Sequence, residues 1–185
     1  RKTKVVKLII PISPTHIKEK KLEQQIKEIS LLDHIKSNFP SNTKIHLAHS
    51  DESNTFGPIY TIKKFLESND ELEGPIIIHY CDLINFFDFD DLIDNAKDLT
   101  LFASNKIHPY RENNHDYSFV QLSPFKVSEK KPLTATPELE HVTTGLYYFR
   151  NKEVLSRLIA IFDNDKDFSR PHKLNQTCNI EQLFF

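Results

Sequence analysis

The chain has 185 residues, the size of one domain with a real hydrophobic core. Its net charge of −2 excludes the strong basic field of a typical nucleic-acid-binding domain. A hydrophobic content of 38% excludes wholesale disorder, and no apolar run approaches the ~18 residues that a transmembrane helix needs. We therefore expect a single domain over residues 1–185, without nucleic-acid or membrane partners, and the composition leaves its oligomeric state open.

Cysteine and glycine are both scarce. Cys81 and Cys178 are far apart in sequence and lack the spacing of a metal site, which favours a reducing compartment, the cytoplasm. The only glycines are Gly57, Gly74 and Gly145. A glycine-rich phosphate-binding loop is therefore absent from the sequence.

The first part of the chain alternates strands and helices. The pattern predicts a buried strand over residues 4–12, a helix N-capped by Thr15 with Ile17, Leu22, Ile26 and Ile29 on one face, a helix over 31–38, a strand over 43–48 and a helix over 58–68. Gly57 and Pro58 fit the start of that last helix, because a proline in the first turn has no N–H to leave unpaired.

The central stretch, residues 74–93, reads GPIIIHYCDLINFFDFDDLI. Residues 75–80 form a short apolar run with three consecutive β-branched isoleucines and no alternation, which indicates a strand buried on both faces. Asp82 follows that strand, where a carboxylate can hold a divalent metal that in turn holds phosphates. The alternative is that Asp82 only caps a turn or forms a hydrogen bond to a neighbouring loop. For Asp88 and Asp90 we expect capping of a following helix rather than a metal-binding D-x-D pair.

The second part is richer in strands. We expect a strand over residues 99–104, a hairpin formed by 117–122 and 125–127, a charged loop over 129–134, a strand over 142–149 and a helix over 151–162. Gly145 inside a strand indicates close approach by a ligand or another backbone. The order predicts an α/β fold with a Rossmann-like, mixed and mostly parallel sheet and flanking helices.

Five short motifs occur in a familiar order and spacing. They are residues 57–62 (GPIYTI), 78–89 (IHYCDLINFFDF), 107–109 (IHP), 129–134 (EKKPLT) and 143–149 (TTGLYYF). This series resembles the sugar-phosphate nucleotidyltransferases, in particular a bacterial branch encoded among surface-polysaccharide genes, over roughly residues 4–162. The resemblance implies the nucleotidyltransferase fold and transfer of a nucleoside monophosphate from an NTP to a phosphorylated, sugar-phosphate-like acceptor. Pyrophosphate would be released with the help of Mg²⁺.

The resemblance also implies roles for particular residues. Asp82 would be a catalytic metal ligand, and Lys130 would contact the phosphate of the acceptor. The nucleotide would lie near Gly57, Thr61, Tyr80 and Cys81, and the acceptor near His108, Glu129, Lys130, Thr144 and Gly145.

The sequence departs from the family at its start. The family's first strand is followed by a G-x-G-x-R loop that wraps the triphosphate, and then by a Pro-Lys-Pro segment; residues 11–16 and a helix stand here instead. Residues 4–12 align better with the family's second strand, as though the first unit were missing. The family's second metal carboxylate also has no counterpart, because Asp163, Asp165 and Asp167 resemble a helix-end loop. We expect this chain alone to bind an NTP poorly and to release no measurable pyrophosphate.

Two other functions stay open. A GT-A-like glycosyltransferase shares the strand-end metal site, but the segment from Asp82 to Ile84 lacks the second carboxylate of a D-x-D pair. A non-catalytic binding or assembly module would keep the fold without the chemistry, which the missing loop favours. A G-x-G-x-R stretch encoded upstream of Arg1 would decide for the enzyme.

Overall fold

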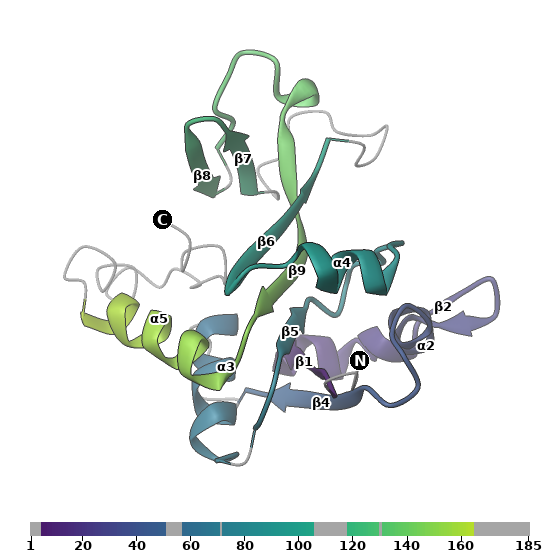
Figure 1. Cartoon of the computed structure of the whole chain (residues 1–185). Helices are drawn as coiled ribbons and strands as arrows, with labels where there is room; N and C mark the ends of the chain where they lie inside the picture. Colours follow the sequence, from purple (N-terminus) through teal and green to yellow (C-terminus); the bar gives the residue numbers. More distant parts are fainter. Residues whose placement is uncertain (1–4, 51–56, 71, 106–117, 130, 165–185) are drawn as a thin grey trace.

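The structure is a computed structural model that describes residues 5–50, 57–70, 72–105, 118–129 and 131–164 (Figure 1). The strands in these ranges are β1 (Lys7–Ile12), β2 (Gln25–Ile26), β3 (Ile29–Ser30), β4 (Lys44–His49), β5 (Ile76–His79), β6 (Leu99–Ser104), β7 (Ser118–Leu122), β8 (Phe125–Glu129) and β9 (His141–Phe149). The helices are α1 (Pro14–Lys18), α2 (Leu31–Ser37), α3 (Pro58–Glu67), α4 (Phe89–Asn95) and α5 (Lys152–Asn164), with short 3-10 turns η1 (Lys21–Glu23) and η2 (Pro137–Leu139). None of the helices in the described ranges is both long enough and apolar enough to cross a membrane.

The main sheet has seven strands in the order β4-β1-β5-β9-β7-β8, with β6 also paired to β9. β1 runs parallel to both β4 and β5, whereas every pair that involves β6, β7, β8 or β9 is antiparallel. The predicted mixed sheet with flanking helices is therefore confirmed. The prediction that the sheet is mostly parallel is wrong, because two of its six described strand pairings are parallel and the strands after β5 all pair antiparallel.

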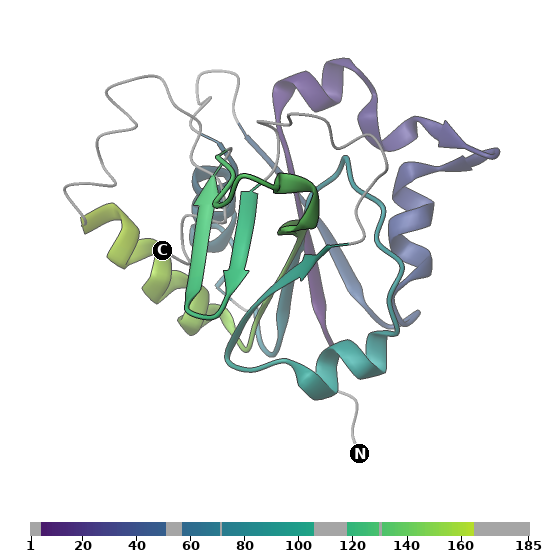
Figure 2. The same cartoon turned by 90° about the horizontal axis from the view of Figure 1, so that it is seen from above.

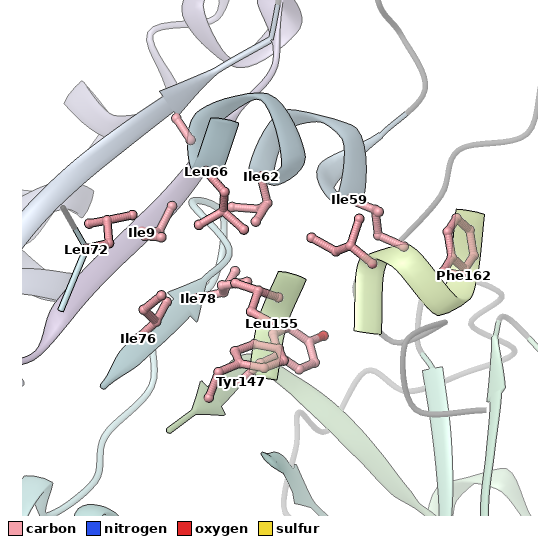
Figure 3. Close-up of a cluster of buried hydrophobic side chains, with 13 residues drawn as sticks. Ile9, Ile59, Ile62, Leu66, Leu72, Ile76, Ile78, Tyr147, Leu155 and Phe162 are labelled. Carbon is pink, nitrogen blue, oxygen red and sulfur yellow. The ribbon is translucent and has the colours of Figure 1, made fainter. Parts of the chain in front are cut away.

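The central strands are buried on both faces, as their continuous apolar runs predict. Along β5, Ile76 and Ile78 point into one core cluster while Ile77 points into the other. Figure 3 shows the first cluster, where Ile76 and Ile78 meet Tyr147 of β9 and the apolar face of α3. Successive side chains of a strand point to opposite faces, so a single run of isoleucines supplies both cores.

The helices cover the sheet in two layers. Ile59, Ile62 and Leu66 of α3 pack in the first cluster together with Leu155 of α5, whereas Leu31 and Ile35 of α2 and Leu92 of α4 pack in the second cluster. Figure 2 shows α5 and α2 on opposite sides of the strands. The helices predicted over residues 31–38, 58–68 and 151–162 are confirmed with shifts of one or two residues at their ends.

The helix predicted from Thr15 is wrong. Ser13 is the N-cap, α1 ends at Lys18, and residues 25–30 form the β2–β3 hairpin instead. Lys20 (φ 50°), Lys27 (φ 52°) and Glu28 (φ 67°) adopt left-handed backbone conformations, which an α-helix cannot contain. Ile17, Ile26 and Ile29 satisfied the helical spacing, yet all three are exposed, so their periodicity reflects no shared buried face.

A second correction concerns Glu129. The predicted hairpin is confirmed, but β8 extends from Phe125 to Glu129, so this residue ends a strand rather than opening a charged loop. Its backbone pairs with Ser118 of β7. Backbone pairing with β7 continues to Glu129 and keeps this residue in the strand, although the charged residues after Val127 had predicted a loop.

Asp88 caps α4, as predicted. Its Oδ1 accepts hydrogen bonds from the backbone N–H groups of Asp90 (2.9 Å) and Asp91 (3.1 Å). These bonds satisfy donors that the first helical turn leaves without partners.

Replacing this cap has a small and local predicted cost. We expect Asp88→Ala to lower the free energy of unfolding by about 1 kcal/mol, as is typical for the loss of an N-cap. Asp90→Ala is the matched control, because it removes a carboxylate from the same turn and keeps both capping bonds. Urea denaturation measures both values, and equal losses for the two variants would contradict a capping role.

Candidate functional site

The carboxyl ends of the three parallel strands lie at one edge of the sheet. β4, β1 and β5 end at His49, Ile12 and His79, and the backbone N–H of Ser50 donates to the Ile12 carbonyl (3.0 Å), which joins the first two ends. Ligands of open α/β sheets bind at this edge, where loops rather than regular structure close the surface. It is therefore the place to look for a site.

The loop after β5, residues 80–85, presents Asp82 at this edge, and we call it the Asp82 loop. The Asp82 side chain is exposed. On one side the loop is held to β9, because the Tyr80 N–H donates to the Gly145 carbonyl (3.0 Å) and Asn85 Nδ2 donates to the Thr144 carbonyl (3.0 Å). The predicted metal ligand thus stands on a loop with fixed ends rather than on a free segment.

His79 forms the floor of this loop. It is fully buried, and burial lowers its pKa to about 4, against weaker opposing effects of the Tyr80 carbonyl and Asp82. The neutral ring donates from Nδ1 to the Tyr80 carbonyl (2.7 Å) and accepts at Nε2 from Asn85 Nδ2 (3.1 Å). Both ring nitrogens are therefore paired, and His79 acts as a structural bridge rather than a proton donor at neutral pH.

Cys81 ties the other side of the loop to the helix after β1. Burial raises the pKa of its thiol to about 12, so the protonated sulfur donates to His16 Nδ1 (3.1 Å). The same nitrogen accepts from the Ser13 N–H (3.3 Å) at the start of α1. A thiol this buried and this weakly acidic is no nucleophile, so Cys81 serves here to hold the loop.

One cation stands near this cluster. The Lys21 ammonium exerts a favourable charge effect on Cys81, lowering the thiol pKa against the larger effect of burial. Lys21 is half-buried at the start of η1, which follows α1. Among the described residues, Lys21 is thus a cation whose charge acts on Cys81, which precedes Asp82 in sequence.

Gly145 lies where β9 passes the Asp82 loop. Its φ is +67°, and a Cβ atom added there would lie 2.3 Å from Leu83 Cδ1 and 3.2 Å from Tyr80 Cδ2. A close approach is thus present, but it is made by side chains of the Asp82 loop and not by the ligand or second backbone that a glycine in this strand predicted.

The other predicted nucleotide residues lie at the start of α3. Gly57 is its N-cap with φ 98°, and Thr61 is a buried residue one turn later whose hydroxyl donates to the Gly57 carbonyl (3.3 Å). Because α3 follows β4 in a parallel crossover, its N-terminus points to the same edge as Asp82. Because the Thr61 hydroxyl already donates its proton within the helix, it is not free to donate to a nucleotide. The backbone of Gly57, at the start of α3, is the other predicted contact at this helix end.

The predicted acceptor residues are only partly described. Thr144 lies beside Gly145, and its hydroxyl donates to the Phe102 carbonyl of β6 (3.1 Å). The backbone of Glu129 ends β8, whereas His108 and Lys130 lie outside the described residues. The structure therefore brings Tyr80, Cys81, Asp82, Thr144 and Gly145 together and leaves the lysine and histidine predictions as they stand.

The loop that follows Lys130 is held by a buried carboxylate. Glu140 accepts hydrogen bonds from the Leu133 N–H, the Thr134 N–H and the Thr134 hydroxyl. Leu133, Thr134 and Glu140 also line a cavity of about 330 Å³ beside the β7–β8 hairpin. The hydrogen bonds to Glu140 thus hold residues 133 and 134 in place, although these residues belong to no helix or strand.

No group of three or more His, Cys, Asp or Glu side chains among the described residues could hold a metal ion. The described residues therefore give Asp82, the predicted metal ligand, no cluster of two or more further His, Cys, Asp or Glu side chains. Any metal at this edge would take most of its ligands from a bound molecule or water.

Sequence reasoning missed four residues that build the site. His79 and Asn85 fasten the Asp82 loop to β9, and Ser13 and His16 fasten it to α1. The one available signal was a histidine inside an otherwise apolar run, since a buried polar ring requires partners. Asn85 carried no signal, because an asparagine in a loop is ordinary.

Neither a model of a known protein family nor a curated protein matches this sequence. Solved structures do match the fold. A protein from Bacillus anthracis described as a glucose-1-phosphate thymidylyltransferase, solved in complex with sucrose, superposes with a TM-score of 0.62 at 12% identity, over 97% of this chain and 81% of that one. A nucleoside-diphosphate-sugar pyrophosphorylase from Vibrio cholerae RC9 superposes with a TM-score of 0.54 at 14% identity, over 88% and 80%. The chain thus has the fold of these sugar nucleotidyltransferases.

Proposed function

We propose that this chain is a nucleotidyltransferase-type domain. It would bind a magnesium–nucleotide complex at the carboxyl edge of β4, β1 and β5 and a phosphorylated small-molecule acceptor beside β9. The reaction of such a site is transfer of a nucleoside monophosphate to the acceptor phosphate. The acceptor phosphate oxygen forms a bond to the α-phosphorus of the NTP, and the bond from that phosphorus to pyrophosphate breaks.

The observation that carries the proposal is the anchored loop of Asp82. Hydrogen bonds to β9 on one side and to His16 on the other place one exposed carboxylate at the edge where this fold class binds ligands. A carboxylate that only capped a turn would need none of this support. Phosphoryl transfer depends mainly on positioned charges, so a held carboxylate suits it.

The donor set at this edge fits Mg²⁺ that arrives with a nucleotide. Magnesium is commonly held by one or two protein carboxylates, with phosphate oxygens and water completing its shell. Asp82 supplies one such ligand, and the described residues provide no complete protein cage. When bound there, the ion would offset the negative charge of the triphosphate.

The chain's own residues supply position and charge. Asp82 orients the phosphates, the backbone at Gly57 faces the same edge at the N-terminus of α3, and Gly145 leaves room where β9 meets the loop. Lys21, whose charge lowers the pKa of the Cys81 thiol against the larger effect of burial, is our candidate for the positive charge that the absent glycine-rich loop would have provided. A single lysine replaces only part of that charge, so catalysis by this chain alone should be slow.

A release assay separates the three functions. With CTP, UTP, ATP or GTP, Mg²⁺ and sugar phosphates, we expect weak nucleotide binding and no measurable pyrophosphate from the 185-residue chain. Steady release by the wild-type chain would contradict this expectation, and its loss in Lys21→Ala would show that Lys21 is required for it. Binding only of nucleotide-sugars would favour a glycosyltransferase, and binding of neither nucleotides nor nucleotide-sugars would favour a non-catalytic module.

The acceptor side is tested at Lys130. We expect Lys130→Ala to weaken a sugar phosphate about tenfold or more, with little effect on the nucleotide, because a charge-assisted contact to phosphate is worth ~1.5–3 kcal/mol. Lys131→Ala is the matched control, since Lys131 is the exposed neighbour in the same loop. Calorimetric titration measures both ligands, and an equal or larger loss in the control would show that the wrong lysine is assigned.

A further inference from the structure

The β5–β9 contact changes character where the Asp82 loop begins. Regular pairing ends with His79 opposite Leu146, and β9 meets its next neighbour on the path, β7, only at Val142 and His141. Between these two pairings, the carbonyls of Thr144 and Gly145 both accept hydrogen bonds from the Asp82 loop. The loop thus substitutes for a paired strand over this short stretch of β9.

Two consecutive carbonyls rarely serve one neighbouring segment, because in an extended strand they point to opposite edges. The left-handed φ of Gly145 breaks that alternation. The Gly145 carbonyl then takes the backbone N–H of Tyr80, while the Thr144 carbonyl takes the Asn85 side chain.

We propose that Asn85 is a positioning residue whose amide fastens the Asp82 loop to β9 and so sets where Asp82 stands relative to Gly145. The two ends of its hydrogen bonding lie on different strands: the Thr144 carbonyl on β9 (3.0 Å) and the buried His79 ring on β5 (3.1 Å). Asn85 follows Asp82 by three residues, and Tyr80 precedes it by two, so the carboxylate is bracketed by contacts to β9. The inference depends on the proposed function only for the identity of the ligand that Asp82 binds.

The neutral state of His79 supports this arrangement. A ring that donates from Nδ1 to the Tyr80 carbonyl must accept at Nε2, and only a donor such as the Asn85 amide can fill that position. A leucine at residue 85 would have a similar size and no donor. It would leave the buried Nε2 atom and the Thr144 carbonyl without this partner, which is costlier than losing an exposed hydrogen bond.

Hydrogen exchange by NMR on the full 185-residue chain tests the fastening. In Asn85→Leu we expect the Tyr80 amide, which donates to Gly145, to exchange about tenfold or more faster, because one buried hydrogen-bonded contact is lost beside it. Amides of the β1–β4 ladder should keep their wild-type protection. Asn95→Leu is the control, since the Asn95 amide bonds only within α4, to the Asp91 carbonyl and carboxylate; it should leave Tyr80 unchanged.

Two results would overturn the inference: wild-type protection of Tyr80 in Asn85→Leu, or an equal loss at Tyr80 and throughout β1–β4, which would mark a general loss of stability. If Asn85→Leu does not fold, Asn85→Ser provides the same test, because its shorter hydroxyl cannot span both partners.

Titration with UTP and Mg²⁺ adds a second measurement, in which we expect about tenfold weaker binding by Asn85→Leu although Asp82 is intact. Absence of binding by the wild-type chain would count against the proposed function, while the exchange result would still decide the role of Asn85.

Discussion

Gly145→Ala is expected to lower the free energy of unfolding by about 3 kcal/mol, the largest stability effect that we predict for a single methyl group in this chain. Part of the cost is backbone strain, since an alanine at φ +67° occupies the left-handed region that L-residues avoid. The rest is overpacking, because the new Cβ would lie 2.3 Å from Leu83 Cδ1 and 3.3 Å from Tyr80 Cβ. Urea denaturation followed by circular dichroism measures the change.

Gly74→Ala separates these two causes. Gly74 also has a positive φ, +86°, but the nearest atoms to an added Cβ lie at ordinary contact distances, 3.4 Å to the Val5 carbonyl oxygen and 3.6 Å to Lys7 Nζ. We therefore expect Gly74→Ala to cost about 1 kcal/mol, from backbone strain alone. Equal losses at the two glycines would show that the Asp82 loop does not crowd Gly145.

A double-mutant cycle then tests the contact itself. Leu83→Ala removes the atom closest to the added methyl group, so Gly145→Ala should cost less in that background, by about 1 kcal/mol. Full additivity of the two substitutions would place the loop farther from β9 than the structure does.

The central strands were predictable because their physics is local. The mostly apolar runs at residues 7–12 (KLIIPI) and 76–79 (IIIH) have neither a helical period nor an alternating polar face, which favours strands buried on both faces. The same holds for Asp88, whose side chain caps the backbone N–H groups of the second and third residues after it. Patterns that involve near neighbours in sequence thus carried most of the fold.

The region after β1 was not predictable in this way. Ile17, Ile26 and Ile29 satisfied a helical period by coincidence, and the left-handed backbone at Lys27 and Glu28 turns the chain into a hairpin. Lysine and glutamate are poor indicators of such a turn, which glycine or asparagine would have marked. A local rule therefore had nothing to detect.

The carboxylate of the candidate site could be predicted from the sequence, whereas the hydrogen bonds that hold its loop could not. Asp82 could be identified because a buried strand ends just before it. Its loop is held by partners that lie far apart in sequence, namely His16, Asn85 and Thr144. His16 and Thr144 are more than a hundred residues apart and come together only in the folded sheet. Contacts between distant segments leave no periodicity, so only the structure shows them.

The second large effect is expected at Asp82. We predict that Asp82→Asn abolishes Mg²⁺-dependent nucleotide binding, because the exposed carboxylate is the one described side chain placed to hold a metal on the β5 loop. Asparagine keeps the size of the side chain and removes its charge. Loss of a charged ligand is worth ~1.5–3 kcal/mol, which takes an already weak affinity below detection.

Asp90→Asn provides the matched control for this substitution. Asp90 is also exposed, lies in the first turn of α4 and makes the same change of charge away from the strand-end loop. It should bind the magnesium–nucleotide complex as the wild-type chain does.

Calorimetric titration of UTP, with and without Mg²⁺, into the wild-type chain, Asp82→Asn and Asp90→Asn tests the proposal most directly. We predict magnesium-dependent binding by the wild-type chain and by Asp90→Asn, and none by Asp82→Asn, while circular dichroism shows all three to be folded. Equal binding by wild type and Asp82→Asn would remove Asp82 from the site, and loss of the fold in Asp82→Asn would assign the residue a structural role instead.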